Sequence, residues 1–253
     1  ADQLVVPVAV PLAPALFVAF VGAAIALNLL FNMPLLAAVA VTSLDTLLVL
    51  GFQKAGIRYL EAFILALVIT IAGCFAVEIV LAKPDYLSVA AGLIPTIDRN
   101  TLLIAVAMLG ATVMPHNLYL HSALVQTRRI GRSVKEKRRA CNYNLIDCVL
   151  ALNGAMFVNG AILILAGTVF FRANKNVTEI QQAYELLTPL MGTVVAAKLF
   201  GVALLAAGQS STLTGTLAGQ IVMEGFLNIR VRPWLRRLVT RSLAIVPACA
   251  AIW

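Results

Sequence analysis

Long runs of apolar residues, separated by short polar stretches, dominate this sequence. Each run is about 20 residues long, the length that an α-helix needs to cross the hydrocarbon core of a bilayer. The alternation of polar and apolar positions that marks a membrane β-barrel is missing. We therefore predict an all-α, polytopic membrane protein that forms a single transmembrane domain over residues 1–253. Its predicted membrane segments are at about residues 13–31, 35–50, 62–81, 102–126, 144–171, 194–227 and 233–253.

Composition supports a membrane protein. Of the 253 residues, 61% are hydrophobic and 12% are charged, whereas a soluble domain carries about 25% charged residues. The net charge of +8 would suggest a nucleic-acid partner in a soluble protein. Here the positive charge lies in the loops between apolar segments, which favours membrane lipid as the partner and argues against nucleic acid.

The basic loops predict the orientation in the membrane. Fourteen of the 19 Lys and Arg residues follow the second, fourth and sixth segments, and these three loops lie on one side. Only Lys83, Arg99, Arg172 and Lys175 lie in the loops on the other side. Because cytoplasmic loops carry the excess of basic residues, we expect the first segment to start in the cytoplasm and the protein to lie in the plasma or inner membrane.

The final apolar run is too short to cross a bilayer. It extends from Ser242 to Trp253, and 12 helical residues rise only about 18 Å. We therefore expect this chain to be a piece of a longer protein.

The fourth segment contains the sequence with the clearest chemistry, GATVMPHNLYLH, from Gly110 to His121. Pro115 has no N–H group, so the carbonyl of Ala111 loses its helical donor. Met114 lies on the same helix face as Ala111. A free carbonyl oxygen beside a thioether sulfur is half of a mixed hard and soft metal site, and the sulfur favours transition metals over Ca²⁺ and Mg²⁺.

A plain kink with Met114 packed in the core is the alternative interpretation of this Met-Pro pair. Two histidines in the same segment favour a functional site, because ionisable residues at membrane depth are usually functional. His116 and His121 are five residues apart and lie on different helix faces, so they cannot chelate one ion together. We expect a role in proton movement or gating for both, since imidazole titrates near physiological pH.

Three stretches carry a resemblance to a known family. GATVMPHNLYLHSALVQ, Gly110–Gln126, closely resembles the sixth transmembrane helix of Nramp divalent-metal transporters, which include bacterial manganese and iron importers. The stretch Ala207–Phe226 resembles the eighth helix of that family, and Pro233–Arg237 resembles the start of the ninth. The resemblance extends from about Phe20 to the C-terminus.

The resemblance implies a LeuT-type fold of two inverted repeats, of which this chain would supply the third to the ninth helix. It implies that Ala111 and Met114 bind the metal, and that His116, His121, Arg236 and Arg237 serve proton movement or gating. The family's Asp-Pro-Gly-Asn motif, which completes the metal site, does not occur here. The first, second and tenth helices would then be missing. The acidic residues usual in the third helix are replaced by Leu16–Phe20.

Other residues receive simpler interpretations. Pro115, Asn117 and Asp45 are assigned structural roles, and Asp147 is expected to form an ion pair near the basic loops. Glu78 and Lys198 lie near segment ends, where long side chains can reach the interface. The small residues Ser211, Gly215 and Gly219 predict a ridge for close helix packing. The four cysteines are expected to be small buried side chains.

The predicted function is proton-coupled uptake of divalent transition metals, Mn²⁺ and Fe²⁺ and by extension Cd²⁺ or Co²⁺, without a cofactor. One alternative is another LeuT-fold carrier, although Met114-Pro115-His116 matches poorly the glycine-rich broken helices of amino-acid permeases. A second is an inactive fragment. A third, an intramembrane metalloenzyme, would need a chelating His pair with a nearby acid, such as HExxH, which is absent.

Overall fold

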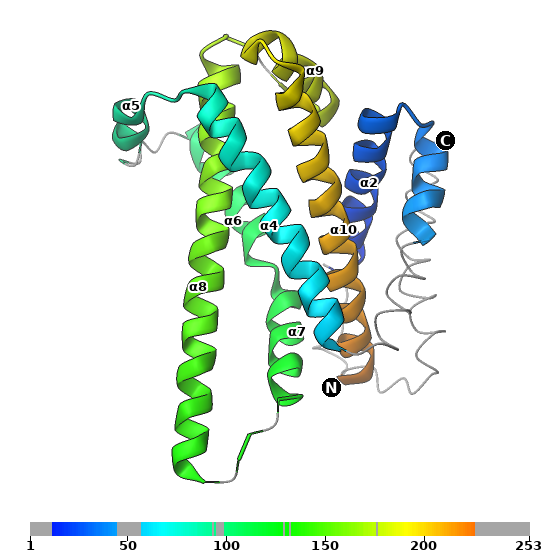
Figure 1. Cartoon of the computed structure of the whole chain (residues 1–253), viewed down its shortest axis with the longest axis vertical. Coiled ribbons are helices and arrows are strands. Elements are labelled where there is room, and N and C mark those ends of the chain that lie inside the picture. The colour runs from blue at the N-terminus through cyan, green and yellow to red at the C-terminus, as the bar shows by residue number, and fades with distance from the viewer. Residues whose placement is uncertain are drawn as a thin grey trace.

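The computed structural model describes residues 12–44, 57–92, 94, 99–128, 130–131, 133–175 and 177–225. Within them the chain is helical (Figure 1). The elements are α2 (Leu12–Phe31), α4 (Ile57–Ala82), α5 (Tyr86–Ala91), α6 (Arg99–Val113), α7 (Pro115–Gln126), α8 (Val134–Ala166), the π-helix η1 (Gly167–Phe171), α9 (Ile180–Met191) and α10 (Val194–Gly225). A further helix, Leu35–Leu44, follows α2.

Four helices of the described part are long and apolar enough to cross a membrane: Arg58–Ala82, Thr101–Gln126, Val134–Phe171 and Val194–Val222. The pair Leu16–Phe31 and Leu35–Leu44 also passes this test together, but its two helices meet at 117°. Some of the predicted segments lie outside the described residues: 45–50 of the segment 35–50, 226–227 of the segment 194–227, and the whole segment 233–253. Asp45, Arg236 and Arg237 also lie outside them.

Helix α10 is the centre of the structure, and α2, α4, α7 and α9 all pack against it (Figure 1). Its contact with α2 is made through glycines. A Cβ atom built on Gly208 would lie 2.7 Å from the Ala23 Cβ and 2.8 Å from the Ala23 backbone N. Three such approaches, spaced seven residues apart, pair Gly201 with Leu30, Gly208 with Ala23 and Gly215 with Leu16. We call this line of contacts the α2–α10 seam.

The seam differs from the ridge that the sequence predicts. Gly215 belongs to both, and Gly219 is buried, but the side chain of Ser211 is exposed. The repeat is seven residues rather than four, because two long antiparallel helices meet along one line and every second turn of α10 returns to it.

A second core lies between α4, the end of α8, η1, α9 and α10. Its buried members include Cys74, Phe75, Leu165, Val169 and Leu187. The short helix α9, which the predicted segments did not include, contributes Leu187 to this core and keeps its polar side outward. The side chain of Cys74 is buried as expected, whereas Cys141 is exposed and Cys148 is partly exposed.

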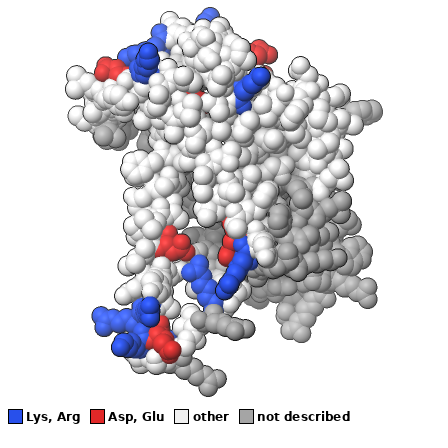
Figure 2. All heavy atoms as spheres, in the orientation of Figure 1, with Lys and Arg blue, Asp and Glu red and all other residues white. Residues whose placement is uncertain are grey.

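Charged side chains lie at the two ends of the described molecule, with an uncharged band between them (Figure 2). Helix α8 begins at Val134, rather than near Asn144 where its apolar run begins. Its start is stabilised by a capping box in which the Ser133 side chain accepts from the Glu136 N–H and the Glu136 carboxylate accepts from the Ser133 N–H. The basic cluster Lys135–Arg139 therefore lies on the first turns of a helix.

The outward faces of α6 and α8 are apolar. Leu103, Leu109, Leu150 and Phe157 are among the exposed large side chains. Soluble monomers rarely expose so large a continuous apolar surface to water. Lipid, or further helices, must cover these faces in the membrane.

Candidate metal site

The membrane span Thr101–Gln126 is broken at Met114, between α6 and α7. Met114 has φ 40° and ψ 75°, which is the left-handed conformation, and Pro115 occupies the first position of α7. A non-glycine residue in this conformation costs about 1–3 kcal/mol. Pro115 also leaves the carbonyl of Ala111 without its helical donor. The structure therefore confirms the predicted break in this segment.

Asn117 holds Met114 at two points. Its backbone N–H donates to the Met114 carbonyl over 3.0 Å, and its side-chain Nδ2 donates to the Met114 sulfur over 3.3 Å. The Asn117 Oδ1 atom is buried and has no hydrogen-bond partner. A thioether is only an acceptor, so the amide nitrogen must face the sulfur. Asn117 thus orients the side chain of Met114.

The side chain of Met114 is 42% exposed, and that of Ala111 is exposed as well. The break therefore presents one thioether and one carbonyl oxygen at an open surface, and both are neutral. No group of three or more His, Cys, Asp or Glu side chains that could hold a metal ion occurs among the described residues. Anionic charge for a divalent ion would have to come from elsewhere.

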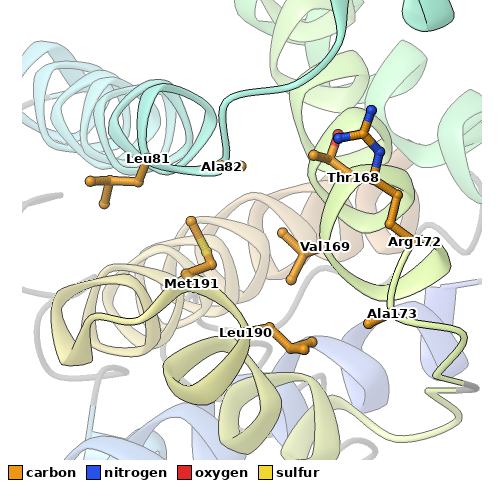
Figure 3. A pocket seen from close by; sticks show the side chains of 8 residues that line it. All are labelled: Leu81, Ala82, Thr168, Val169, Arg172, Ala173, Leu190 and Met191. Atoms are coloured by element: carbon orange, nitrogen blue, oxygen red, sulfur yellow. The ribbon is translucent and has the colours of Figure 1, made fainter.

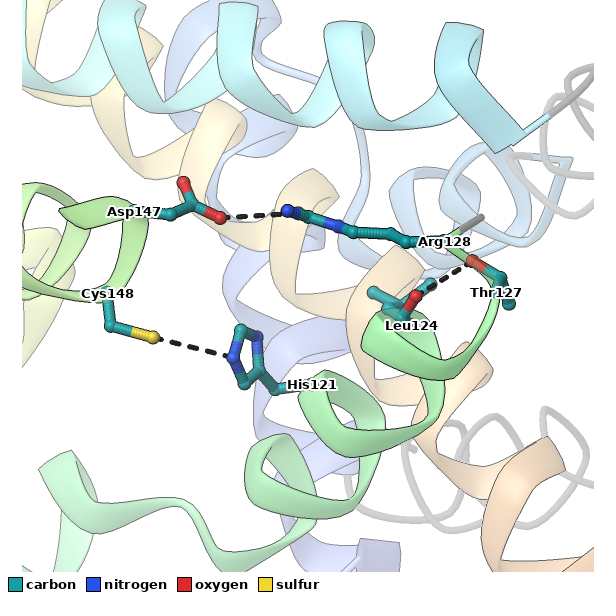
Figure 4. A network of polar contacts seen from close by, with 6 residues as sticks. All are labelled: His121, Leu124, Thr127, Arg128, Asp147 and Cys148. Carbon is teal, nitrogen blue, oxygen red and sulfur yellow. Dashed lines mark hydrogen bonds and ion pairs between the residues drawn. The ribbon is translucent and has the colours of Figure 1, made fainter. Parts of the chain in front are cut away.

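Helix α7 also contacts α8 through side chains (Figure 4). The Nε2 atom of His121 lies 3.5 Å from the Cys148 sulfur, and the Arg128 guanidinium lies 3.3 Å from the Asp147 carboxylate. The ion pair expected for Asp147 is therefore confirmed. Both of its side chains are about half exposed, so it contributes little to stability.

The structure brings together some of the predicted site residues. Met114 and Asn117 are in contact at the break, Ala111 lies three residues before it in α6, and His121 faces α8 two turns further along. His116 belongs to α7, but its side chain lies outside the described part, as do Arg236 and Arg237. The sequence gives no sign that Cys148 is the partner of His121, because the two residues belong to different helices.

The interpretation of Glu78 was wrong. Its side chain does not reach the interface but is completely buried, and neither carboxylate oxygen has a hydrogen-bond partner. The expectation failed because α4 packs against α10 and α8, and the position of a residue near a helix end does not reveal which neighbours cover it.

The fold and the site define a polytopic helical membrane protein with a broken helix, at which the thioether of Met114 is exposed. The chain belongs to the Nramp family: the family model described as natural resistance-associated macrophage protein-like matches residues 7–253. This family consists of transporters, which excludes the metalloenzyme alternative.

Named relatives agree with this assignment. The natural resistance-associated macrophage protein 2 homolog of Dictyostelium discoideum is 53% identical over 234 residues, which is 92% of this chain and 37% of that protein. The divalent metal cation transporter MntH of Listeria innocua is 53% identical over 233 residues, 90% of this chain and 52% of that protein. This chain therefore spans about half or less of the length of these relatives.

A solved structure confirms the fold. The crystal structure of the Eremococcus coleocola manganese transporter in complex with an aromatic bis-isothiourea substituted compound matches with a TM-score of 0.85 and 36% sequence identity, covering 95% of this chain and 53% of that chain. The partial LeuT-type architecture predicted from the sequence is thus the fold of this chain.

Proposed function

We propose that the protein containing this chain takes up divalent transition metal ions, Mn²⁺ and Fe²⁺, across the cell membrane together with protons. One observation carries the proposal: the thioether of Met114 is exposed at a helix break, beside a carbonyl that has lost its helical donor. Several relatives are named as divalent metal cation transporters, and broken helices are where secondary transporters bind their ions.

The ligands support selection for transition metals. Sulfur binds Mn²⁺, Fe²⁺ or Cd²⁺ more readily than it binds Ca²⁺ or Mg²⁺, which prefer oxygen alone. The sulfur has a second lone pair, so it can face a metal while it accepts the Asn117 hydrogen bond. A doubly charged ion also needs anionic charge when it leaves water. We infer that this charge comes from a helix of the longer protein, and that first, second and tenth helices complete the fold.

The proposal also assigns residues to proton movement and gating. His121 lies within 3.5 Å of the Cys148 sulfur at the contact between α7 and α8, a place where a change of its charge would alter helix packing. We propose gating or proton transfer for His121, and the same for His116, Arg236 and Arg237. The basic residues at the start of α8 support an orientation in which the first segment starts in the cytoplasm.

Another LeuT-fold carrier is the second candidate. A carrier for a carboxylate substrate would present backbone N–H groups at its broken helix. At this break the N–H of Asn117 already donates to Met114, which favours a cation as the substrate.

Replacement of Met114 in the full-length transporter tests the proposal. In liposomes, Met114→Ala should reduce Cd²⁺ and Mn²⁺ uptake, and Ca²⁺ should compete more strongly for what remains, because only oxygen ligands are left. Met108→Ala is the matched control, since Met108 is a similarly exposed methionine of α6 that lies away from the break. Unchanged Ca²⁺ competition in Met114→Ala would refute Met114 as a ligand.

A further inference from the structure

Glu78 is a buried acid that the metal site does not use. It lies on α4, its side chain has 0% exposure, and both carboxylate oxygens are buried without a hydrogen-bond partner. A carboxylate taken out of water without a partner loses its hydration and gains nothing in return. Nothing in the described structure compensates a charged Glu78 for this lost hydration.

A cavity begins one helical turn beyond Glu78. It has a volume of about 310 Å³ and is lined by Leu81 and Ala82 of α4, by Thr168, Val169 and Arg172 at η1, and by Met191 of α9 among others (Figure 3). Leu81 and Ala82 are three and four residues after Glu78, so they lie on the same face of α4. The cavity offers a hydroxyl and a guanidinium and has room for several water molecules, each of which occupies about 30 Å³.

The nearby charged groups are engaged or turned outward. Hydrogen bonds from the Ser88 hydroxyl and the Leu87 N–H, together with the charge of Arg172, hold the pKa of Asp85 below its usual range. The side chains of Lys198 on α10 and Glu185 on α9 are exposed, and Tyr184 packs against the second core.

The only ion pair within the described part of the chain is Arg128–Asp147, so Glu78 belongs to none there. One turn back on α4, the buried Cys74 thiol is the nearest titratable group on the same helix.

The wall of the cavity contains an irregular helix. Residues Gly167–Phe171 form a π-helix at the end of α8, and single π-helical turns occur frequently at functional sites. Val169 of this turn belongs both to the cavity lining and to the core beside Cys74 and Phe75. The π-helical turn therefore connects the wall of the cavity to the core that contains α4.

We propose that Glu78 is a proton-exchange site, separate from the helix break, that gains and loses its proton through this cavity. The Glu78 carboxylate would take a proton from hydrated H⁺ in the cavity, leaving water, and would return it to water by the same path. The cavity lies at the end of the molecule that holds Lys83 and Arg172, which is the outer end in the orientation proposed above. The assignment as part of proton-coupled uptake depends on the proposed function, but the exchange itself does not.

Infrared difference spectroscopy of the full-length transporter tests the proposal without any metal. A protonated-carboxyl band should be present, should decline as the pH is raised, and should be lost in Glu78→Gln. Glu185→Gln, which removes an exposed acid of α9, should leave that band unchanged. A Glu78 band that does not vary over the accessible pH range would show a permanently neutral structural acid and would overturn the proposal, as would the absence of any Glu78-dependent band.

A second variant keeps the test open if Glu78→Gln does not fold. Leu81→Phe narrows the cavity but retains the acid, so the shift of the carboxyl band in deuterated water should become slower than in the unmodified protein. An equally fast shift would show that protons do not reach Glu78 through the cavity. Two measurements on Glu78→Gln separate this result from the metal site. Cd²⁺ binding in detergent should persist, whereas liposome uptake should lose its dependence on external pH.

Discussion

The α2–α10 seam allows a quantitative test of the packing. At Gly208, an added methyl group would meet the Ala23 Cβ at 2.7 Å and the Ala23 Cα and N at 2.8 Å. Two of these three atoms are backbone, so α2 itself must move to make room. Overpacking of this kind costs about 1–3 kcal/mol. We therefore predict that Gly208→Ala destabilises the protein.

The other glycines provide graded controls. At Gly215 the added methyl would meet the tip of the Leu16 side chain at 2.7 Å, which can rotate away, so Gly215→Ala should cost less. At Gly160 on α8 no atom lies within 4 Å, and Ala is favoured over Gly in a helix by about 1 kcal/mol. Gly160→Ala should therefore be neutral or stabilising.

Heating the full-length protein in detergent and measuring the folded fraction by size-exclusion chromatography gives the order of stability. A difference of 1 kcal/mol shifts the melting temperature by about 2–4 °C in proteins of 150–250 residues, and the shift becomes smaller in longer proteins, so the order of the variants is the result to compare. Ala23→Gly should restore Gly208→Ala only in part, because it removes the Cβ contact and leaves both backbone contacts. Equal melting temperatures for Gly208→Ala and Gly160→Ala would refute the seam.

Two further predictions concern the ends of the molecule. A cysteine introduced at Arg132 should react with an impermeant thiol reagent only from the cytoplasm, and one introduced at Lys175 should react only from outside. The reason is that cytoplasmic loops carry the excess of basic residues. Reaction of both cysteines from one side would contradict the topology. Ser133→Ala removes the capping box of α8 and should cost about 1 kcal/mol, measurable as a lower melting temperature, whereas Ser133→Asp, which can still cap, should not.

The features that could be predicted from the sequence depend on interactions between residues close together in the chain. The length of an apolar run that crosses a bilayer is set by the bilayer thickness, so an all-helical membrane protein could be predicted from the sequence. The break at Met114 was predictable because Pro115 removes a hydrogen bond that its own helix needs. The position of α9 was missed, since a short helix with one apolar side has no membrane-length run. The start of α8 was placed late because its capping box precedes the apolar stretch.

The sequence by itself determined the class of protein and the helix break at Met114, since both depend on residues a few positions apart. Only the tertiary structure decided which side chains are covered. Glu78 is buried because α4 packs against α10 and α8, and Gly208 is essential to packing because Ala23, far away in the sequence, lies against it. Burial and close approach depend on how distant segments meet, and a pattern along one helix does not contain that information.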